Sequence, residues 1–197
     1  MLAQSSTFEG GLPSVGKRGT SRPSPTASDV SAQPYQGSSV GLFVSILVRY
    51  PEVASVTYCR DSHSLRLTFL LRESLSEERS AAWRSLLEKS VRAYTALTGR
   101  TVRLFDVQVK VKGTVTVIEM WRDVDSLTQG ELSVVLSCAA ETFGDRLVVD
   151  QVPHIEMDEL AAQEEIIEEM LEDLRESRHQ PSLIAFREEG RVLVYNQ

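Results

Sequence analysis

The sequence predicts an α+β fold, specifically a two-layer sandwich in which antiparallel hairpins are covered by helices. In two pairs of segments apolar and polar residues alternate, and each pair is joined by a short polar turn. Three other segments carry apolar residues three and four positions apart, which is the helical period. A hairpin with one apolar face needs a helical layer over that face. The expected order is helix, hairpin, helix, hairpin, helix, followed by an acidic helix and a terminal hairpin.

The chain divides into three predicted parts: a tail (1–37), an α+β core domain (38–150) and an extension (151–197). The first 37 residues hold five of the eleven glycines and four of the seven prolines. A segment this poor in apolar residues is predicted to be disordered. The change at Ser38 also suggests the hypothesis that translation begins near Val40, which intact-mass measurement of the native protein would test.

The beginning of the chain also bears on its location. Its first residues, MLAQSSTFEGG, lack a charged segment followed by an apolar one, so no secretory signal is predicted. The longest apolar runs fall far short of the roughly 20 residues that span a bilayer, so no membrane helix is expected. We therefore expect a cytoplasmic protein.

The first helix and hairpin follow the tail. Apolar residues from Leu42 to Tyr50 lie on one helical face, and Pro51 stops the helix. Alternating segments near 55–59 and 65–72 then form a hairpin whose turn carries His63, expected to be exposed to solvent. The two cysteines, Cys59 and Cys138, have neither disulfide nor metal spacing and are expected to be buried.

The next two helices are predicted from capping residues and periodicity. The second opens at Ser74 or Ser76, where Ser74 and Glu77 have capping-box spacing, and it ends at Gly99. Its expected buried residues are Trp83, Leu86, Leu87, Val91, Tyr94 and Leu97. The third opens at Ser126, with Gln129 completing a capping box, and ends at Gly144. Residues 147–149 are expected to add a short strand.

The second hairpin has the clearest strand pattern, with apolar residues alternating from Phe105 to Val111. A three-residue loop at 112–114 would place Val115, Val117 and Trp121 on the same apolar face. That register puts Glu119 on the apolar face as well. Either an arginine at the sheet margin pairs with Glu119, or the register slips there.

Through residue 122, the order of these elements resembles the roadblock or profilin-like architecture, in which a helix, two strands and a helix precede three strands and a final helix. The chain has two clear strands where that family has three. The resemblance implies a scaffold or regulator rather than an enzyme.

The predicted helix at 156–176 carries most of the negative charge. It holds ten acidic residues against one basic residue, Arg175, a net charge of −9, whereas the whole chain has a net charge of −7. Like charges four positions apart oppose an isolated helix. Docking of its apolar stripe, on the chain's own core or on another subunit, must compensate. The stripe comprises Leu160, Ile167, Met170, Leu171 and Leu174.

This charge suggests a partner, namely a protein with a basic surface, because fields of one sign steer association. A solvated face that only aids solubility is the other interpretation. A two-stranded hairpin is marginal alone, so residues 183–195 must dock on the central sheet or across a homodimer, and we expect the homodimer. The expected partner-binding residues are Glu164, Glu165, Glu168, Glu169, Glu172, Asp173, Phe186 and Val194.

No catalytic, metal or cofactor motif is recognisable, and we expect no cofactor. His63 follows Cys59 by four residues, but no third group orients a nucleophilic pair. His154, Glu156 and Asp158 alternate as metal ligands on an extended chain would, but they lie at a helix boundary, where the alternation is lost. Glu176 and His179 have the spacing found in helical di-metal sites, but such a site needs a second motif of the same kind, which the sequence lacks. Nucleic acid is an unlikely partner at a pI near 5.1, despite Lys110, Lys112, Arg100 and Arg103. A non-enzymatic interaction module is the expectation, and a small-molecule or metal-dependent enzyme with scattered site residues is the alternative.

Overall fold

The computed structural model describes residues 38–149, 157–188 and 190–197. The described chain is α+β, with four α-helices and one six-stranded antiparallel sheet. The helices are α1 (Ser38–Arg49), α2 (Glu77–Thr98), α3 (Gln129–Phe143) and α4 (Met157–Glu176). The strands are β1 (Ser55–Cys59), β2 (Ser64–Leu71), β3 (Phe105–Lys112), β4 (Val115–Asp123), β5 (Leu183–Glu188) and β6 (Arg191–Asn196). None of these helices combines the length and apolar character needed to cross a bilayer.

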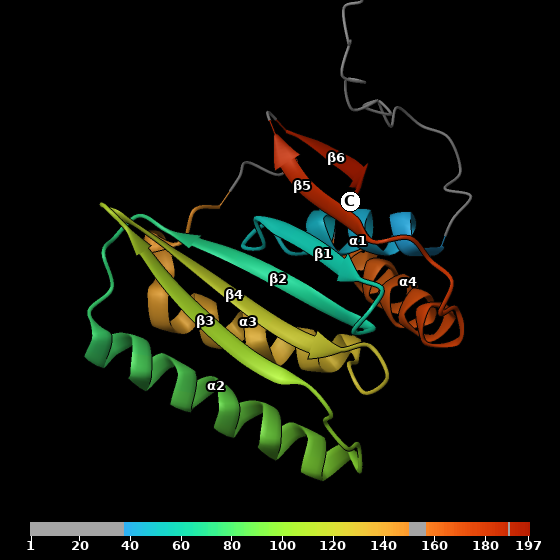
Figure 1. Ribbon diagram of the computed structural model, residues 1–197, viewed down its shortest axis with the longest axis horizontal. Helices are drawn as coiled ribbons and strands as arrows, with labels where there is room; N and C mark the ends of the chain where they lie inside the picture. Colours follow the sequence, from blue (N-terminus) through green and yellow to red (C-terminus); the bar gives the residue numbers. More distant parts are fainter. Residues whose placement is uncertain (1–37, 150–156, 189) are drawn as a thin grey trace, which may run out of the picture.

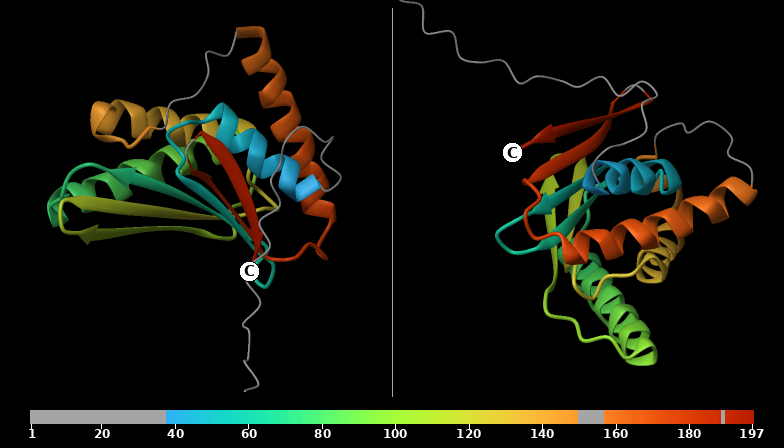
Figure 2. Two further views of the ribbon diagram at one scale, coloured as in Figure 1. Left: turned by 90° about the horizontal axis from the view of Figure 1, so that it is seen from above. Right: turned by 90° about the vertical axis from the view of Figure 1, so that its right-hand side faces the viewer.

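The sheet has the strand order β3-β4-β2-β1-β5-β6, and the helices cover one of its faces (Figure 1). Figure 2 shows the strands forming one layer and the helices the other. Among the described residues no helix covers the opposite face, which we call the open face. The covered face holds the core, in which alternate residues of β2 (Leu65, Leu67, Phe69 and Leu71) are at most 1% exposed.

Local residue chemistry fixes the helix ends. The α1 helix ends two residues before Pro51, as predicted. The Ser76 side chain caps α2 by accepting a bond from the Arg79 N–H, so of the two predicted starts Ser76 is right and the Ser74–Glu77 box is wrong. At its other end Gly99 has a φ of 67°, a left-handed conformation that glycine adopts without strain.

The predicted start of α3 is wrong by two residues. Thr128, not Ser126, is the cap, and it accepts a bond from the Glu131 N–H. The Ser126 hydroxyl instead donates to Asp123. The end at Gly144 is confirmed. Beyond it, the expected strand at 147–149 is reduced to a single bridge between Leu71 and Leu147.

The register of the second hairpin also differs from the prediction. Lys112 pairs with Val115, so the loop has two residues rather than three, and Gly113 takes a φ of 62° at its first position. A shift of one residue moves every side chain of a strand to the other face. Glu119 and Trp121 therefore lie on the open face, and the buried inward residues are Thr116, Ile118, Met120 and Arg122.

The C-terminal segment docks on the rest of the same chain. Strand β5 pairs antiparallel with β1, placing Val56 opposite Ala185, and β6 pairs with β5. The α4 helix packs along α1. Its side chains Ile167, Leu171 and Leu174 are fully buried. This docking in cis supplies the compensation that the charge repulsion within α4 requires.

Some of the expected burials do not occur. Leu86 and Leu97 are 44% and 88% exposed, because they lie on the side of α2 that faces away from the sheet. Both cysteines are half-buried. Glu88 and Arg92, on the side of α2 toward β3, form an ion pair across one turn.

Candidate functional site

The outer side of α4 carries a row of exposed carboxylates. We call Glu165, Glu169, Glu172 and Asp173 the acidic face. Glu172 approaches Arg175 at 3.6 Å, whereas the other three have no ion-pair partner among the described residues. Glu165 with Glu169, and Glu169 with Asp173, are like charges four residues apart, and each such pair costs a few tenths of a kcal/mol. The docked helix thus retains an unneutralised negative surface.

Two of the predicted partner-binding residues on α4 have contacts within the chain. Glu164 accepts hydrogen bonds from the guanidinium of Arg49 on α1. Glu168 accepts a bond from the Gln129 N–H at 2.7 Å, at the first residue of α3, and also contacts Arg175. A carboxylate at a helix N-terminus is favourable both as a hydrogen-bond acceptor and against the helix dipole. These two side chains therefore attach α4 to α1 and α3.

The structure separates the two predicted partner-binding residues of the hairpin. The ring of Phe186 lies on the open face, stacked against Tyr195 with a centroid distance of 5.6 Å and an interplanar angle of 10°. Val194 lies on the opposite face and packs against the core. The acidic face lies in the helix layer. The predicted residues therefore form two surfaces, one on α4 and one on the open side of the hairpin.

His63 and its neighbours form a buried cluster of titratable groups where β1 turns into β2. His63 is 8% exposed, so the expectation of a solvent-exposed histidine is wrong. Its Nδ1 is 3.0 Å from the hydroxyl of the fully buried Tyr58, and Nε2 is 3.3 Å from Asp125 Oδ1. The second contact is electrostatic and is not aligned as a hydrogen bond. Both ring nitrogens thus face groups other than Cys59.

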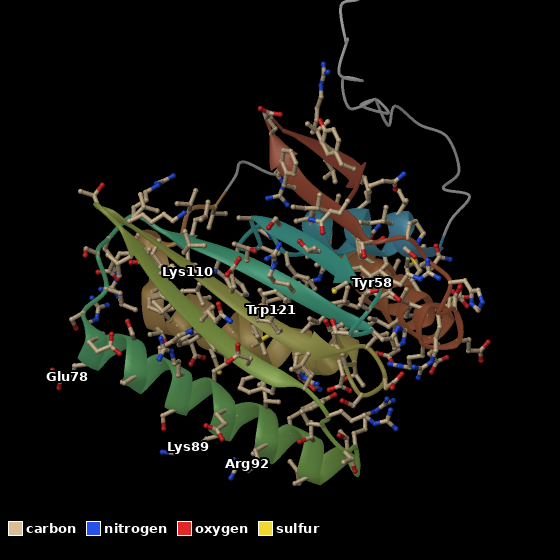
Figure 3. The ribbon with its side chains drawn as sticks, in the orientation of Figure 1. Tyr58, Glu78, Lys89, Arg92, Lys110 and Trp121 are labelled. Carbon is tan, nitrogen blue, oxygen red and sulfur yellow. The ribbon has the colours of Figure 1, made fainter. Side chains whose placement is uncertain are left out.

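Asp125 joins the His63 cluster to more distant parts of the chain. Its carboxylate pairs with Arg103 at 2.7 Å and with Arg178 at 3.3 Å. Burial, together with the charge of Arg178, lowers the pKa of His63 against the opposing effect of Asp125. Burial also raises the pKa of Tyr58, which Figure 3 labels. The cluster is therefore neutral at His63 and Tyr58, and its charged groups lie at its outer edge.

A second buried polar cluster ties β4 to α3. Arg122 and Glu131 are both 0% exposed, and two guanidinium nitrogens of Arg122 meet the two carboxylate oxygens of Glu131, one at 2.8 Å. Burial alone would raise the pKa of Asp123. Hydrogen bonds from Ser126 and from backbone N–H groups, with the charge of Arg122, hold that pKa below its usual range. The cluster is fully paired, which is typical of a structural role.

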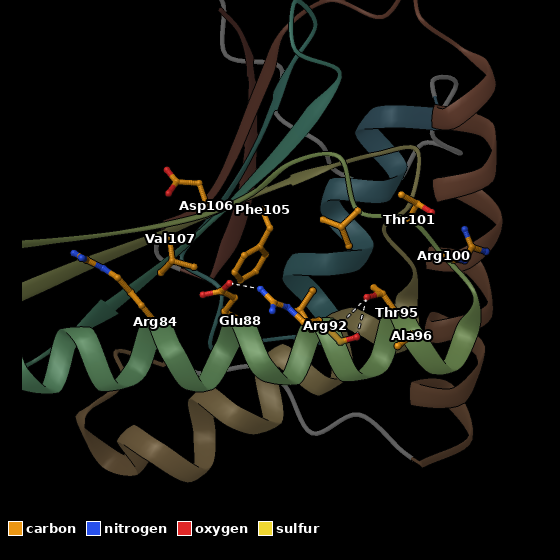
Figure 4. A pocket seen from close by; sticks show the side chains of 12 residues that line it. Arg84, Glu88, Arg92, Thr95, Ala96, Arg100, Thr101, Phe105, Asp106 and Val107 are labelled. Atoms are coloured by element: carbon orange, nitrogen blue, oxygen red, sulfur yellow. Dashed lines mark hydrogen bonds and ion pairs between the residues drawn. The ribbon is translucent and has the colours of Figure 1, made fainter.

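A groove of about 630 Å³ runs between α2 and β3 (Figure 4). The Phe105 ring projects from β3 into this space, and Arg84, Arg92 and Arg100 lie along α2 and just beyond its end. Glu88 and Asp106 offset two of the three positive charges. None of the residues in the two buried clusters lines this groove. The groove is therefore not a pocket with convergent buried titratable groups.

The basic and metal-ligating residues considered from the sequence are dispersed. Lys110, labelled in Figure 3, pairs with Glu119, and Arg103 pairs with Asp125, so two of the four basic side chains considered are neutralised. Glu176 and His179 are exposed, while His154 lies outside the described residues. Within the described part of the chain, no three His, Cys, Asp or Glu side chains gather as metal ligands.

Comparison with known proteins does not identify a family. No family model, no curated protein and no solved structure matches this chain. Beyond β4, where the roadblock or profilin-like order has a third strand, the chain enters α3 directly.

Of the two buried clusters that the sequence did not predict, only the one at Arg122 and Glu131 had a signal in the sequence. Arg122 continues the alternation of inward residues on β4, and Glu131 stands three residues after Thr128, which is capping-box spacing. Burial of His63 had no local signal, because Asp125 and Arg178 reach it from distant segments.

We predict that His63 makes the folded state sensitive to acid. Because its folded-state pKa lies below the ordinary value of 6.5, the unfolded state takes up the proton first. The free energy of unfolding should fall as pH drops through 6.5 and level off below the folded-state pKa. His63 has a φ of 45°, which asparagine tolerates, so His63→Asn should reduce this slope in urea titrations at several pH values.

His179→Asn is the matched control for this prediction, because His179 is exposed. The control should retain the slope of the unaltered chain. If His63→Asn also retained it, another group would be responsible.

Proposed function

We propose that this chain is a non-enzymatic, cytoplasmic protein-interaction or regulatory module whose acidic face binds a protein with a basic surface. In this proposal the helix-hairpin-helix-hairpin-helix core is the scaffold, and the acidic helix and terminal hairpin form the extension that contacts the partner. The supporting observation is that α4 is docked while Glu165, Glu169 and Asp173 keep no ion-pair partner among the described residues.

Charge complementarity explains why such a surface favours a basic partner. On the inner side of α4, Glu164 pairs with Arg49 and Glu168 pairs with Arg175, so these two carboxylates are neutralised within the chain. Glu165, Glu169 and Asp173 have no arginine partner among the described residues, so their mutual repulsion remains. A cationic partner would relieve that repulsion and would be steered by the field.

The alternative, a small-molecule or metal-dependent enzyme, is favoured by one observation, the Tyr58–His63–Asp125 cluster, in which Tyr58 and His63 are buried. Perturbed titratable groups gather at active sites. Here, however, each group is engaged by its neighbours, and none lines the groove beside α2. The enzyme alternative predicts a small molecule that stabilises the unaltered chain against heat but not His63→Asn.

Neutralising the acidic face tests the proposal. The triple variant Glu165→Gln, Glu169→Gln, Asp173→Asn should fold with unchanged or slightly higher stability, because like-charge repulsion is relieved. A basic protein captured from native lysate by the full chain should bind the variant about tenfold more weakly, which corresponds to a loss of about 1.4 kcal/mol. The difference should shrink between about 0.1 M and about 1 M salt, where the Debye length falls from about 10 Å to about 3 Å.

Glu164→Gln with Glu168→Gln is the matched control, because it removes charge from the same helix at positions that pair within the chain. This variant should lose stability and keep most of its partner affinity. Equal affinity of the triple variant and the unaltered chain for the captured protein would refute electrostatic docking.

A further inference from the structure

The two edges of the sheet differ in how well they resist pairing with another strand. An edge strand presents unpaired backbone groups, and charged side chains, lysine above all, blunt it. Strand β3 carries the exposed Asp106, Lys110 and Lys112. Strand β6 has a single charged residue, Arg191 at its first position, followed by Val192, Leu193, Val194 and Tyr195. With so few charged side chains, β6 is an edge strand that could pair with a further strand.

The backbone direction along β6 follows from one hydrogen bond. The Gln197 N–H donates to the Ser182 carbonyl, so residue 197 points its backbone groups toward β5. Because direction alternates along a strand, residues 195 and 193 point the same way. The N–H and C=O groups of Val192, Val194 and Asn196 therefore point away from the sheet, at its outer edge (Figure 1).

The side chains of β6 suit a second copy of the same strand. In an antiparallel pair centred on Val194, Val192 faces the partner's Asn196 and Leu193 faces the partner's Tyr195. The charged Arg191 would lie at the far end of the pair, so no like charges meet. On the open face, Leu193 would meet the stacked rings of Phe186 and Tyr195, forming a cross-strand apolar contact.

We propose that two copies of this chain associate by antiparallel pairing of β6 with β6 about a two-fold axis at Val194, which joins their six-stranded sheets into one. The proposal deepens the proposed function, on which it rests, by naming one partner of the terminal hairpin as a second copy. Exchange of the hairpin between subunits is not needed, because β5 already pairs with β1 of its own chain. The two-fold arrangement uses the outer edge of β6, which lies on the other side of β5 from β1.

The size of the contact sets the expected affinity. Each strand contributes six residues, far fewer than the 20–30 per side of a standard interface. We expect a reversible monomer–dimer equilibrium with a dissociation constant on the order of micromolar. Sedimentation equilibrium of the full chain, from below to well above that concentration, measures it.

A proline substitution isolates the backbone contribution. Val194→Pro removes an N–H that points outward, where an edge strand tolerates proline, and Val194→Ala keeps that N–H while losing similar packing. Dimerisation should weaken at least tenfold in Val194→Pro and change little in Val194→Ala. Circular dichroism and cooperative urea unfolding of each variant check that it is folded.

A charge substitution on the open face tests the side-chain contact without altering the backbone. Leu193→Lys should weaken the dimer at least tenfold by placing two positive charges beside the two-fold axis. Val115→Lys, on the same face at the opposite end of the sheet, should leave the dissociation constant unchanged.

Three outcomes would overturn the β6 pairing. They are a full chain that stays monomeric at all concentrations, equal weakening by Val194→Ala and Val194→Pro, and a dimer unaffected by Leu193→Lys. The purified chain is measured alone, so failure here is distinct from failure of the acidic face to bind a basic partner. The triple variant of the acidic face should dimerise normally, which keeps the two tests separate.

Discussion

Replacing Glu131 with alanine is expected to lower the free energy of unfolding by about 3–5 kcal/mol, because it leaves a buried guanidinium with only part of its pairing. Arg122 and Glu131 are both 0% exposed, and the guanidinium meets both carboxylate oxygens. Asp123 would retain its contact with Arg122, which places the loss toward the lower end of that range. Urea unfolding monitored by fluorescence measures the change.

A double variant provides the control for Glu131→Ala. Arg122→Met with Glu131→Leu removes both charges and should recover much of the loss, since well-packed apolar residues often replace a buried ion pair at little cost. A loss below about 1 kcal/mol in Glu131→Ala would mean that the pair contributes no more than a surface ion pair does.

Ending the chain at Pro153 is expected to abolish cooperative folding. The truncation removes five side chains that are at most 4% exposed: Ile167, Leu171, Leu174, Leu183 and Ala185. Burial of a large apolar side chain contributes about 1.5–3 kcal/mol, so their sum is comparable to the 5–15 kcal/mol that stabilises a typical domain. The truncation also exposes the apolar side of α1 and one edge of β1.

Near-UV circular dichroism and urea unfolding of the shortened chain test this expectation. A chain lacking only 191–197 is the milder control, because it keeps β5 paired with β1 and α4 packed on α1. It should unfold cooperatively at a lower urea concentration. Cooperative unfolding of the form ending at Pro153 would show that residues 38–153 fold independently.

The sequence predicted the parts of the fold that depend on local chemistry. Pro51, Gly99 and Gly144 mark helix ends because each restricts or frees the backbone at its own position. The α+β class followed from two periodicities that side chains obey without reference to distant residues. The prediction of the second hairpin was wrong in one local detail, the loop length. The loop is one residue shorter than predicted, and this reverses the faces on which the side chains from Val115 to Trp121 lie.

The candidate sites were predicted less well, because their contacts join distant segments. The charge of α4 could be counted from the sequence. The sequence did not predict that Glu164 would contact Arg49 or that Glu168 would contact the start of α3. His63 becomes buried only because the loop carrying Asp125 and the segment carrying Arg178 converge on it. Cis docking of the hairpin is likewise decided by β1, far away in the chain.

The pairing of β1 with β5 has a consequence during protein synthesis. Ser55 emerges from the ribosome long before its partner Phe186, and at roughly 5–20 residues per second the delay is roughly 7–26 seconds. Over that interval β1 lacks one neighbour, and Val56 and Tyr58 lack part of their cover. Unpaired strand edges are aggregation-prone, so the nascent chain stays vulnerable at β1 until β5 has emerged. Overproduction at low temperature with abundant nascent-chain chaperones should therefore raise the folded yield.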